Sequence, residues 1–232
     1  KRIVLKITDN SYWISIADLM TGLMVVFLFI AINFVIQAFQ YRYVQDEIYN
    51  TLLAEFEDEI VNNDIQIAPD GTVRFNTNDE RLLFELGEHS LTQEMKNTLD
   101  WFIPRYITIM SNPDYLDYIK EIRIEGHTDT VPPKSGEDSY TFNLRLSSLR
   151  AIEVLRYVRS SKAYNILDSD TKDRFDFLLT ATGMSFSKAL NSENEYVYES
   201  DTKDIDLEIS RRVEFRVVTS SEGLMEEIFT ME

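Results

Sequence analysis

Residues 14–39 read ISIADLMTGLMVVFLFIAINFVIQAF, and this stretch divides the chain into two parts. It contains no Lys, Arg or Glu, and Asp18 is its one acidic residue. A helix needs about 20 mostly apolar residues, at about 1.5 Å each, to span a hydrocarbon core. The stretch is long enough, so the sequence predicts a transmembrane helix over residues 13–40. The 232-residue chain leaves room for one globular domain after it.

Asp18 is the first candidate site residue, because an ionised carboxylate in a membrane costs about 2.5 to 3.5 kcal/mol on insertion scales. Such residues are usually paired, reached by water, or protonated, so Asp18 is a candidate proton carrier. At 100° per residue, Gly22, Val25 and Phe29 lie within about 40° of Asp18 and leave a gap that suits a neighbouring helix. The alternative is an acid near the helix start that reaches the lipid headgroups.

The charge of the chain is divided unequally between its two parts. Residues 1–40 carry three basic and two acidic residues, a net of +1, so the total of −17 leaves −18 for residues 41–232. Basic residues beside a first membrane helix favour the cytoplasmic side. The sequence predicts a cytoplasmic tail over 1–12, a single span, and an acidic domain outside. No small-residue cleavage pattern follows the apolar stretch, so we expect it to be retained as an anchor.

Composition excludes several classes of function. The chain has no Cys, which excludes disulfides and Cys-based metal or redox chemistry, and its acidity argues against binding nucleic acid. His127 precedes Thr128 and Asp129 without a nucleophile elbow, so it is interpreted as a hydrogen-bonded loop histidine. The acidic residues near 168–173 lack the glycine and terminal Glu of a calcium loop and are expected to form a solvated turn. No catalytic residue, metal or cofactor is predicted.

Residues 41–64 connect the predicted span to the domain. Val44, Ile48, Leu52 and Phe56 are spaced by four, which indicates an amphipathic helix. Two interpretations stay open for it: a connecting helix that stacks on the folded domain, or a segment that contacts a second copy or gates the channel.

The globular domain is expected over residues 65–220, with a C-terminal tail over 221–232. Alternating apolar residues and turn signals predict the order β-α-β-α-β-β, an α+β fold with helices packed on a mixed sheet. The first helix is expected to have a capping box of Ser90 and Gln93 and to be interrupted or kinked at Pro104. The other expected elements are strands over 72–76, 119–125, 177–182 and 212–218, a helix over 142–158 and an acidic loop over 191–206.

The membrane stretch resembles a known family. Trp13, the run Ala17-Asp18-Leu19-Met20-Thr21 and Met24 are similar to the single helix of the flagellar stator B subunit, MotB. The resemblance implies that Asp18 binds the transported ion, with Thr21 in possible support. It implies H⁺ as the ion, with Na⁺ as the alternative. It also implies two partners: a second copy of the chain, and a ring of multi-spanning MotA-like A subunits.

A second resemblance covers most of residues 70–218. The matching elements, in order, are Ile122-Arg123-Ile124-Glu125-Gly126-His127-Thr128-Asp129, Asn143, Leu146-Ser147, Arg150-Ala151, Gly183 and Arg211-Arg212-Val213. Together they are similar to the OmpA-like peptidoglycan-binding domain. This implies that Asp129 and Arg150 hold the diaminopimelate of the wall stem peptide.

The chemistry of the two residues suits that ligand. Asp129 can accept hydrogen bonds from an ammonium, and Arg150 offers a bidentate fork to a carboxylate. Asn143 and Leu146 precede Arg150 by seven and four residues, so the three share a helix face. Thr128 and Phe142 complete the predicted set. The alternative is a salt bridge between Asp129 and Arg150 that only pins the loop to the helix.

A membrane acid joined to a wall-binding domain predicts the B subunit of an ion-driven motor in the bacterial inner membrane, with a periplasmic domain held by peptidoglycan. The short linker and the loop sequence GHTDTVPP are more similar to the B subunits of Zorya anti-phage defence systems than to flagellar stators. A motility stator stays open, as does a passive wall tether without ion flow. Against the tether, an inert anchor has no need of Asp18.

Overall fold

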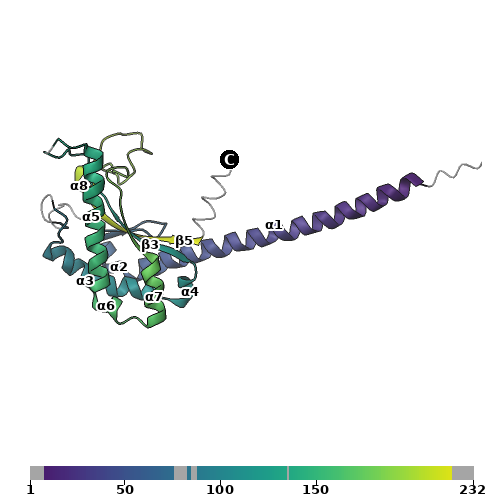
Figure 1. Cartoon of the computed structure of the whole chain (residues 1–232), viewed down its shortest axis with the longest axis horizontal. Helices are drawn as coiled ribbons and strands as arrows, with labels where there is room; N and C mark the ends of the chain where they lie inside the picture. Colours follow the sequence, from purple (N-terminus) through teal and green to yellow (C-terminus); the bar gives the residue numbers. More distant parts are fainter. Residues whose placement is uncertain (1–7, 76–82, 85–87, 135, 221–232) are drawn as a thin grey trace, which may run out of the picture. The chain divides into compact units, whose positions relative to one another are not determined.

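The chain was analysed as a computed structural model, in which residues 8–75, 83–84, 88–134 and 136–220 are described (Figure 1). The predicted C-terminal tail, the basic residues of the N-terminal tail and Asn76 lie outside these residues. Residues 1–43 and 44–232 form two units, which are treated separately.

Helix α1, Thr8–Glu55, contains the predicted span. Within it, Tyr12–Gln37 is long and apolar enough to cross a membrane, and its most apolar 18-residue window has a mean hydropathy of 2.6. None of that window is buried against the rest of the chain, and large side chains such as Trp13 and Phe29 are exposed. An apolar surface of this length in a single helix fits a lipid environment.

The second unit is built on a five-stranded sheet in the order β1-β2-β5-β3-β4. Strands β3 and β4 pair in parallel, and the other neighbours are antiparallel, so the sheet is mixed as predicted. The strands are β1 (Ile65–Ile67), β2 (Val73–Phe75), β3 (Ile119–Gly126), β4 (Leu179–Gly183) and β5 (Val213–Thr219).

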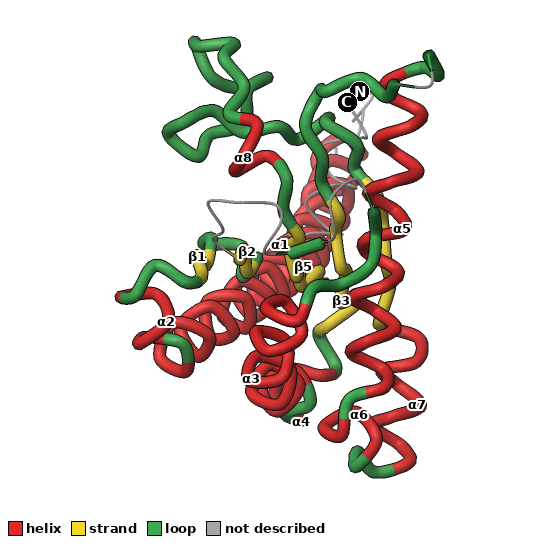
Figure 2. The backbone as a smooth tube through the Cα atoms, turned by 90° about the vertical axis from the view of Figure 1, so that its left-hand side faces the viewer, coloured by secondary structure: helices red, strands yellow, loops and turns green. Residues whose placement is uncertain are grey.

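Two long helices and several short ones accompany the sheet, and α5 and α7 lie beside β3 and β4 (Figure 2). The helices after α1 are α2 (Glu57–Val61), α3 (Gln93–Met110), α4 (Pro113–Leu116), α5 (Ser139–Ser160), α6 (Lys162–Asn165), α7 (Ser169–Leu178) and α8 (Leu207–Ser210).

The apolar core lies on one face of the sheet. Ile124 and Phe215 are register partners, so their side chains point to the same side. Phe215 packs edge to face on Phe102 of α3 with ring centroids 5.0 Å apart. On the same side, a Cβ added to Gly126 would meet the Ser147 carbonyl oxygen at 2.2 Å, so β3 contacts α5 at a distance that only glycine allows. Both long helices therefore cover this face.

The end of α1 belongs to this core. Val44, Ile48, Leu52 and Phe56 are all buried, and the last two have no exposed surface. Arg105 of α3 lies over the Phe56 ring at 4.4 Å. Of the two interpretations of the spacing by four, the structure shows the connecting helix that stacks on the folded domain.

Three local predictions were wrong. Helix α3 is capped by Thr92, whose Oγ1 accepts the Met95 N–H at 3.1 Å, and not by the Ser90 and Gln93 box, because Gln93 is already its first residue. Of the interruption or kink expected at Pro104, the interruption is wrong, because α3 continues through this residue. The acidic run near 170 is not a turn, because Asp168 caps α7 by accepting the Thr171 N–H.

Candidate functional site

The loop after β3 carries the predicted ligand residues and is fastened to two other strands. The His127 N–H donates to the Arg212 carbonyl at 2.9 Å, just before β5. The Thr128 N–H donates to the Ser185 carbonyl at 2.9 Å, just after β4. The strand order β5-β3-β4 therefore holds the start of the loop from both sides.

Asp129 is 5% exposed, and both of its carboxylate oxygens have partners. Oδ1 accepts the Val131 N–H at 2.9 Å, a side-chain turn that shapes the loop. Oδ2 accepts the Nε–H of Arg211 and forms an ion pair with it. The ion pair that the described residues show for Asp129 is therefore made with Arg211, and the alternative of an Asp129–Arg150 salt bridge is wrong.

Helix α5 supplies the other wall of the site. Asp138 caps it by accepting the Thr141 N–H at 2.8 Å. One turn later, Asn143 is buried and donates to the Val131 carbonyl at 3.3 Å, so the helix holds the loop directly. The Ser147 hydroxyl oxygen accepts the Ser185 N–H at 3.1 Å. These bonds place Asn143 beside the Asp129 turn.

Arg150 faces a different neighbour. It is 2% exposed, its Nε donates to the Glu88 carbonyl at 3.1 Å, and its guanidinium lies over the Phe84 ring at 4.8 Å. A guanidinium stacked on an aromatic ring gains cation–π energy. The structure thus brings Thr128, Asp129 and Asn143 together and packs Arg150 against the segment that precedes α3.

The remaining predicted residues differ in accessibility. Thr128 is buried, and its Oγ1 has no hydrogen-bond partner among the described residues. Leu146 and Phe142 are half-buried on α5, and the guanidinium of Arg145 lies 5.6 Å from the Phe142 ring. A buried hydroxyl without a partner costs free energy, so Thr128 Oγ1 is an unsatisfied polar atom among the described residues of the site.

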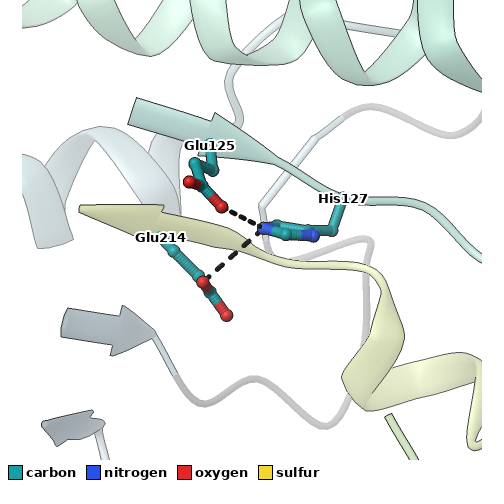
Figure 3. A group of neighbouring side chains, drawn as sticks. All are labelled: Glu125, His127 and Glu214. Atoms are coloured by element: carbon teal, nitrogen blue, oxygen red, sulfur yellow. Dashed lines mark ion pairs between the residues drawn. The ribbon is translucent and has the colours of Figure 1, made fainter. Parts of the chain in front are cut away.

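Behind the loop, on the face of the sheet opposite the helices, lies a buried polar cluster of Glu125, His127 and Glu214 (Figure 3). Glu125 and Glu214 are register partners on β3 and β5. His127 Nε2 lies 3.4 Å from Glu125 Oε2 and 3.6 Å from Glu214 Oε2. Like charges directly opposite one another destabilise a sheet unless they are compensated.

Cationic side chains supply that compensation. Glu214 Oε1 accepts from Arg212 Nε at 2.6 Å and from Arg74 Nε at 2.7 Å. Lys188 Nζ lies 3.5 Å from Glu125 Oε2. Burial works to raise the pKa of Glu214, but His127 together with the charges of Arg212 and Arg74 outweighs it and lowers the pKa to about 2. Burial, together with the charge of Arg212, lowers the pKa of His127, so its imidazole is neutral at pH 7.

Glu125, His127 and Glu214 offer ligand atoms that all lie within 4.8 Å of one another, a spacing that a metal ion could bridge. Yet the two carboxylates already contact Arg74, Arg212 and Lys188. A divalent cation would add to a positive charge that is already in excess. The cluster fits a charge-compensated polar core that holds β3 and β5 together, and it does not fit a metal centre.

In the other unit, Asp18 is exposed on the apolar helix, and no hydrogen bond or ion pair of its side chain is found within the described residues. The Thr21 hydroxyl donates to the Ala17 carbonyl at 2.8 Å, one turn back along the helix. Asn33 likewise donates to the Phe29 carbonyl at 3.1 Å. The Thr21 hydroxyl proton is used in the bond to the Ala17 carbonyl. The Thr21 oxygen therefore acts as a hydrogen-bond acceptor toward its surroundings.

Sequence reasoning missed Arg211 as a site residue. It was recognised only as part of the motif before the last strand, while the partner of Asp129 was sought on α5. The side chain of Arg211 is 26% exposed and that of Asp129 is 7% exposed, so the arginine forms the outer member of the pair. The pairing follows from the strand order, which sets the start of β5 beside the end of β3 and which the sequence pattern does not specify.

The α+β domain with this mixed sheet has a fold that is found among solved structures. The domain is similar to the crystal structure of a MotB-like protein from Desulfovibrio vulgaris, with a TM-score of 0.51 and 22% identity. The match covers 79% of this chain and 99% of that one, and it confirms the predicted fold class. No family model matches the chain.

The chain is also similar to two curated proteins named Zorya protein ZorB. One, from Escherichia coli strain ATCC 8739, is 34% identical over 236 residues, which is 96% of this chain and 94% of that protein. The other, from Escherichia coli O139:H28, is 26% identical over 90% of this chain and 80% of its own length. The chain belongs to the ZorB family. This confirms the prediction of a B subunit of a Zorya system, which is not an enzyme.

Proposed function

We propose that the chain is the B subunit of a proton-driven motor complex of the inner membrane, anchored to peptidoglycan and acting in anti-phage defence. The observation that carries this proposal is Asp18, an exposed acid on a helix otherwise apolar over the length of a membrane. Family membership supports the defence role over motility.

In this mechanism a proton from outside neutralises Asp18, and the neutral helix face then passes an apolar surface of a partner. Release to the cytoplasm restores the charge. A potential of 100 mV supplies about 2.3 kcal/mol per proton, comparable to the roughly 2.5 to 3.5 kcal/mol of burying the carboxylate. A proton needs one titrating carboxylate, which Asp18 provides, and the acceptor oxygen of Thr21 suits a protonated acid that donates to it. Sodium is the alternative ion.

One helix cannot enclose an ion path, so the complex requires partners. We propose a second copy of this chain and a ring of multi-spanning MotA-like subunits. The domain, in the periplasm, would hold the complex still by gripping the stem peptide. Asp129 would take an ammonium of the ligand and Arg150 a carboxylate, while Thr128, Asn143, Leu146 and Phe142 would line the pocket.

The test is Asp18→Asn, which keeps size and hydrogen bonding but removes titration. We expect normal expression and assembly and loss of phage protection in cells that carry the complete system. Asp46→Asn is the matched control, because Asp46 is an exposed acid on the same helix outside the apolar window. Protection at the wild-type level by Asp18→Asn would leave a passive tether as the better account.

A further inference from the structure

We propose that the domain has a second interaction surface, a hollow that receives a large apolar side chain of a cationic polypeptide partner. The hollow lies on the loop of residues 184–206, which joins β4 to α8 and is drawn in green beside α8 in Figure 2. Its volume is about 380 Å³, within the range of about 300 to 1,000 Å³ that binding pockets occupy. Its walls are mainly apolar or aromatic, formed by Phe186, Ala189, Val197, Tyr198 and Ile205. None of these residues belongs to the predicted wall site.

The loop is held in shape by its own hydrogen bonds. The Val197 N–H donates to the Ala189 carbonyl at 3.0 Å. Lys203 Nζ donates to three carbonyls, those of Val197, Tyr198 and Ser200, at 3.0, 3.3 and 3.0 Å. Loops longer than about 12 to 15 residues without helices or strands are usually either functional or disordered, and these bonds fix this one. The hollow therefore exists before a partner arrives, which lowers the entropy cost of binding.

Two aromatic side chains of the hollow are supported by aromatic neighbours outside it. Phe186 contacts Tyr140 of α5 edge to face, with ring centroids 5.3 Å apart. Tyr198 stacks on Tyr196 with centroids 5.9 Å apart, and it is 62% exposed. Tyrosine is enriched among the residues that contribute most to protein–protein binding. An exposed, supported tyrosine at the wall of an apolar hollow thus favours a protein as the partner.

The charge around the hollow defines the chemistry of that partner. Residues 193–208 include seven acidic side chains and one basic residue, Lys203, whose ammonium is already bound to loop carbonyls. Asp204 stands between the lining residues Lys203 and Ile205, and Asp201 precedes Lys203 by two positions. Both acids are exposed, and neither side chain has a hydrogen bond or ion pair within the described residues. An apolar anchor flanked by Lys or Arg complements this surface.

Charge also separates this partner from the alternatives. A second copy of the domain is disfavoured, because residues 41–232 carry a net charge of −18 and would be repelled by the acidic residues of the loop. An uncharged glycan would stack on Tyr198 and leave those acids without a role. A cationic polypeptide uses both the apolar hollow and the acids.

Two synthetic peptides test the proposal: acetyl-GKKWKKG-amide and the same peptide with alanine in place of tryptophan. Their binding to the full-length protein in uncharged detergent micelles is measured by calorimetry at low salt, and titrations into protein-free micelles are subtracted. We expect the tryptophan peptide to bind about tenfold more tightly, the size of effect that an anchor side chain has in protein interfaces.

Variants then locate the binding. In Tyr198→Ala the tenfold ratio should fall toward one, because a wall of the hollow is lost. Phe177→Ala is the matched control, since Phe177 is an 88% exposed aromatic residue on α7, and the ratio should stay at ten. The double variant of Asp201→Asn with Asp204→Asn should weaken both peptides by about threefold and keep the ratio, since exposed charge pairs contribute modestly.

The matched control for charge is Asp170→Asn with Asp173→Asn, two exposed acids on α7, which should leave both affinities unchanged. Equal binding of the two peptides by the unaltered protein would reduce the effect to general charge attraction and overturn the proposal. Absence of binding by both peptides, or an undiminished ratio in Tyr198→Ala, would overturn it as well. Binding of the neutral glycan chitotetraose that is lost in Tyr198→Ala would make the hollow a glycan site and overturn the polypeptide partner. None of these outcomes touches the proposed function, which rests on Asp18.

Discussion

The two units of this chain treat their acidic residues in opposite ways. In the domain, Glu125 and Glu214 face one another in the sheet and are compensated by arginine and lysine from neighbouring elements. In the membrane-length helix, Asp18 stands alone within the described residues. The domain therefore satisfies its own charges, whereas the helix has an acid that needs another chain or a proton. The first arrangement is typical of a stable scaffold and the second of a moving part.

The largest expected effect on stability tests the first half of this comparison. Arg212→Met removes the bonds to Glu214 and to the carbonyls of Ser210 and Lys188. Breaking a buried ion pair by removing one partner costs about 3 to 5 kcal/mol. Thermal unfolding of the full chain in detergent, followed by tryptophan fluorescence, should show a large drop in Tm. Arg156→Met, at an exposed pair with Glu153, is the control, and an equal effect of the two would contradict the account.

A somewhat smaller effect is expected at the wall site. Asp129→Ala or Arg150→Ala should weaken binding of the detergent-solubilised protein to purified peptidoglycan, because either loss leaves one charged group of the ligand unpaired. That costs on the order of 2 to 5 kcal/mol if the group is buried. Sedimentation with wall sacculi measures this. Unchanged sedimentation of both variants, with unchanged Tm, would remove the proposed pocket.

The pH dependence of stability tests whether the domain satisfies the charges of its buried polar cluster. The folded pKa of His127 lies below its ordinary value of about 6.5, so only the unfolded state gains this proton as pH falls through 6.5, and stability declines. The folded pKa of Glu214 is about 2, so its contribution is present above about pH 4.5 and is lost between there and 2.

We therefore expect Tm to fall steadily from pH 7 toward pH 4, and His127→Gln to flatten the part of the curve just below 6.5. His89→Gln, at the other histidine of the chain, should leave the curve unchanged. A Tm that is constant or rises on acidification over this range would show that the cluster is not held as described.

The smallest effect concerns the junction between helix and domain. Arg105 bonds Glu55 and Glu59 and covers the Phe56 ring, so it fixes the end of α1 on α3. These ion pairs are partly exposed, and Arg105→Gln should lower stability by only about 0.5 to 1 kcal/mol. We expect phage protection to be unaltered in Arg105→Gln. If protection is lost although Tm changes this little, the junction has a role in gating.

Much of the fold could be predicted from sequence because its central elements have strong periodic patterns. The alternation in 119–125 and 212–218 predicted β3 and β5, and the leucine spacing in 142–158 predicted α5. Strands β1 and β2 both have three residues, too few to show a period by themselves, and β1 was missed because it lacks a turn signal such as Asp70-Gly71 before β2. Helix α7 was missed because its sequence is mostly polar. Phe175 is its one buried residue, and a single apolar residue shows no helical periodicity.

The site was predictable only in part, for a topological reason. Asp129 and Arg150 were recognised by motif, but the pairing of Asp129 with Arg211 joins residues 82 positions apart. It depends on β5 lying next to β3, an order that local patterns do not specify. The same applies to the Glu125–Glu214 pair, whose members are unremarkable acids until the register places them opposite one another.

The most direct test of the central claim is proton flux. The complex with its A subunits, reconstituted in liposomes with a pH-sensitive dye inside, would be placed under a potassium-diffusion potential. We predict potential-driven proton entry with the unaltered chain and with Asp46→Asn, and only background leak with Asp18→Asn. Equal proton entry with Asp18→Asn would contradict the account, because the path would then not run through this carboxylate.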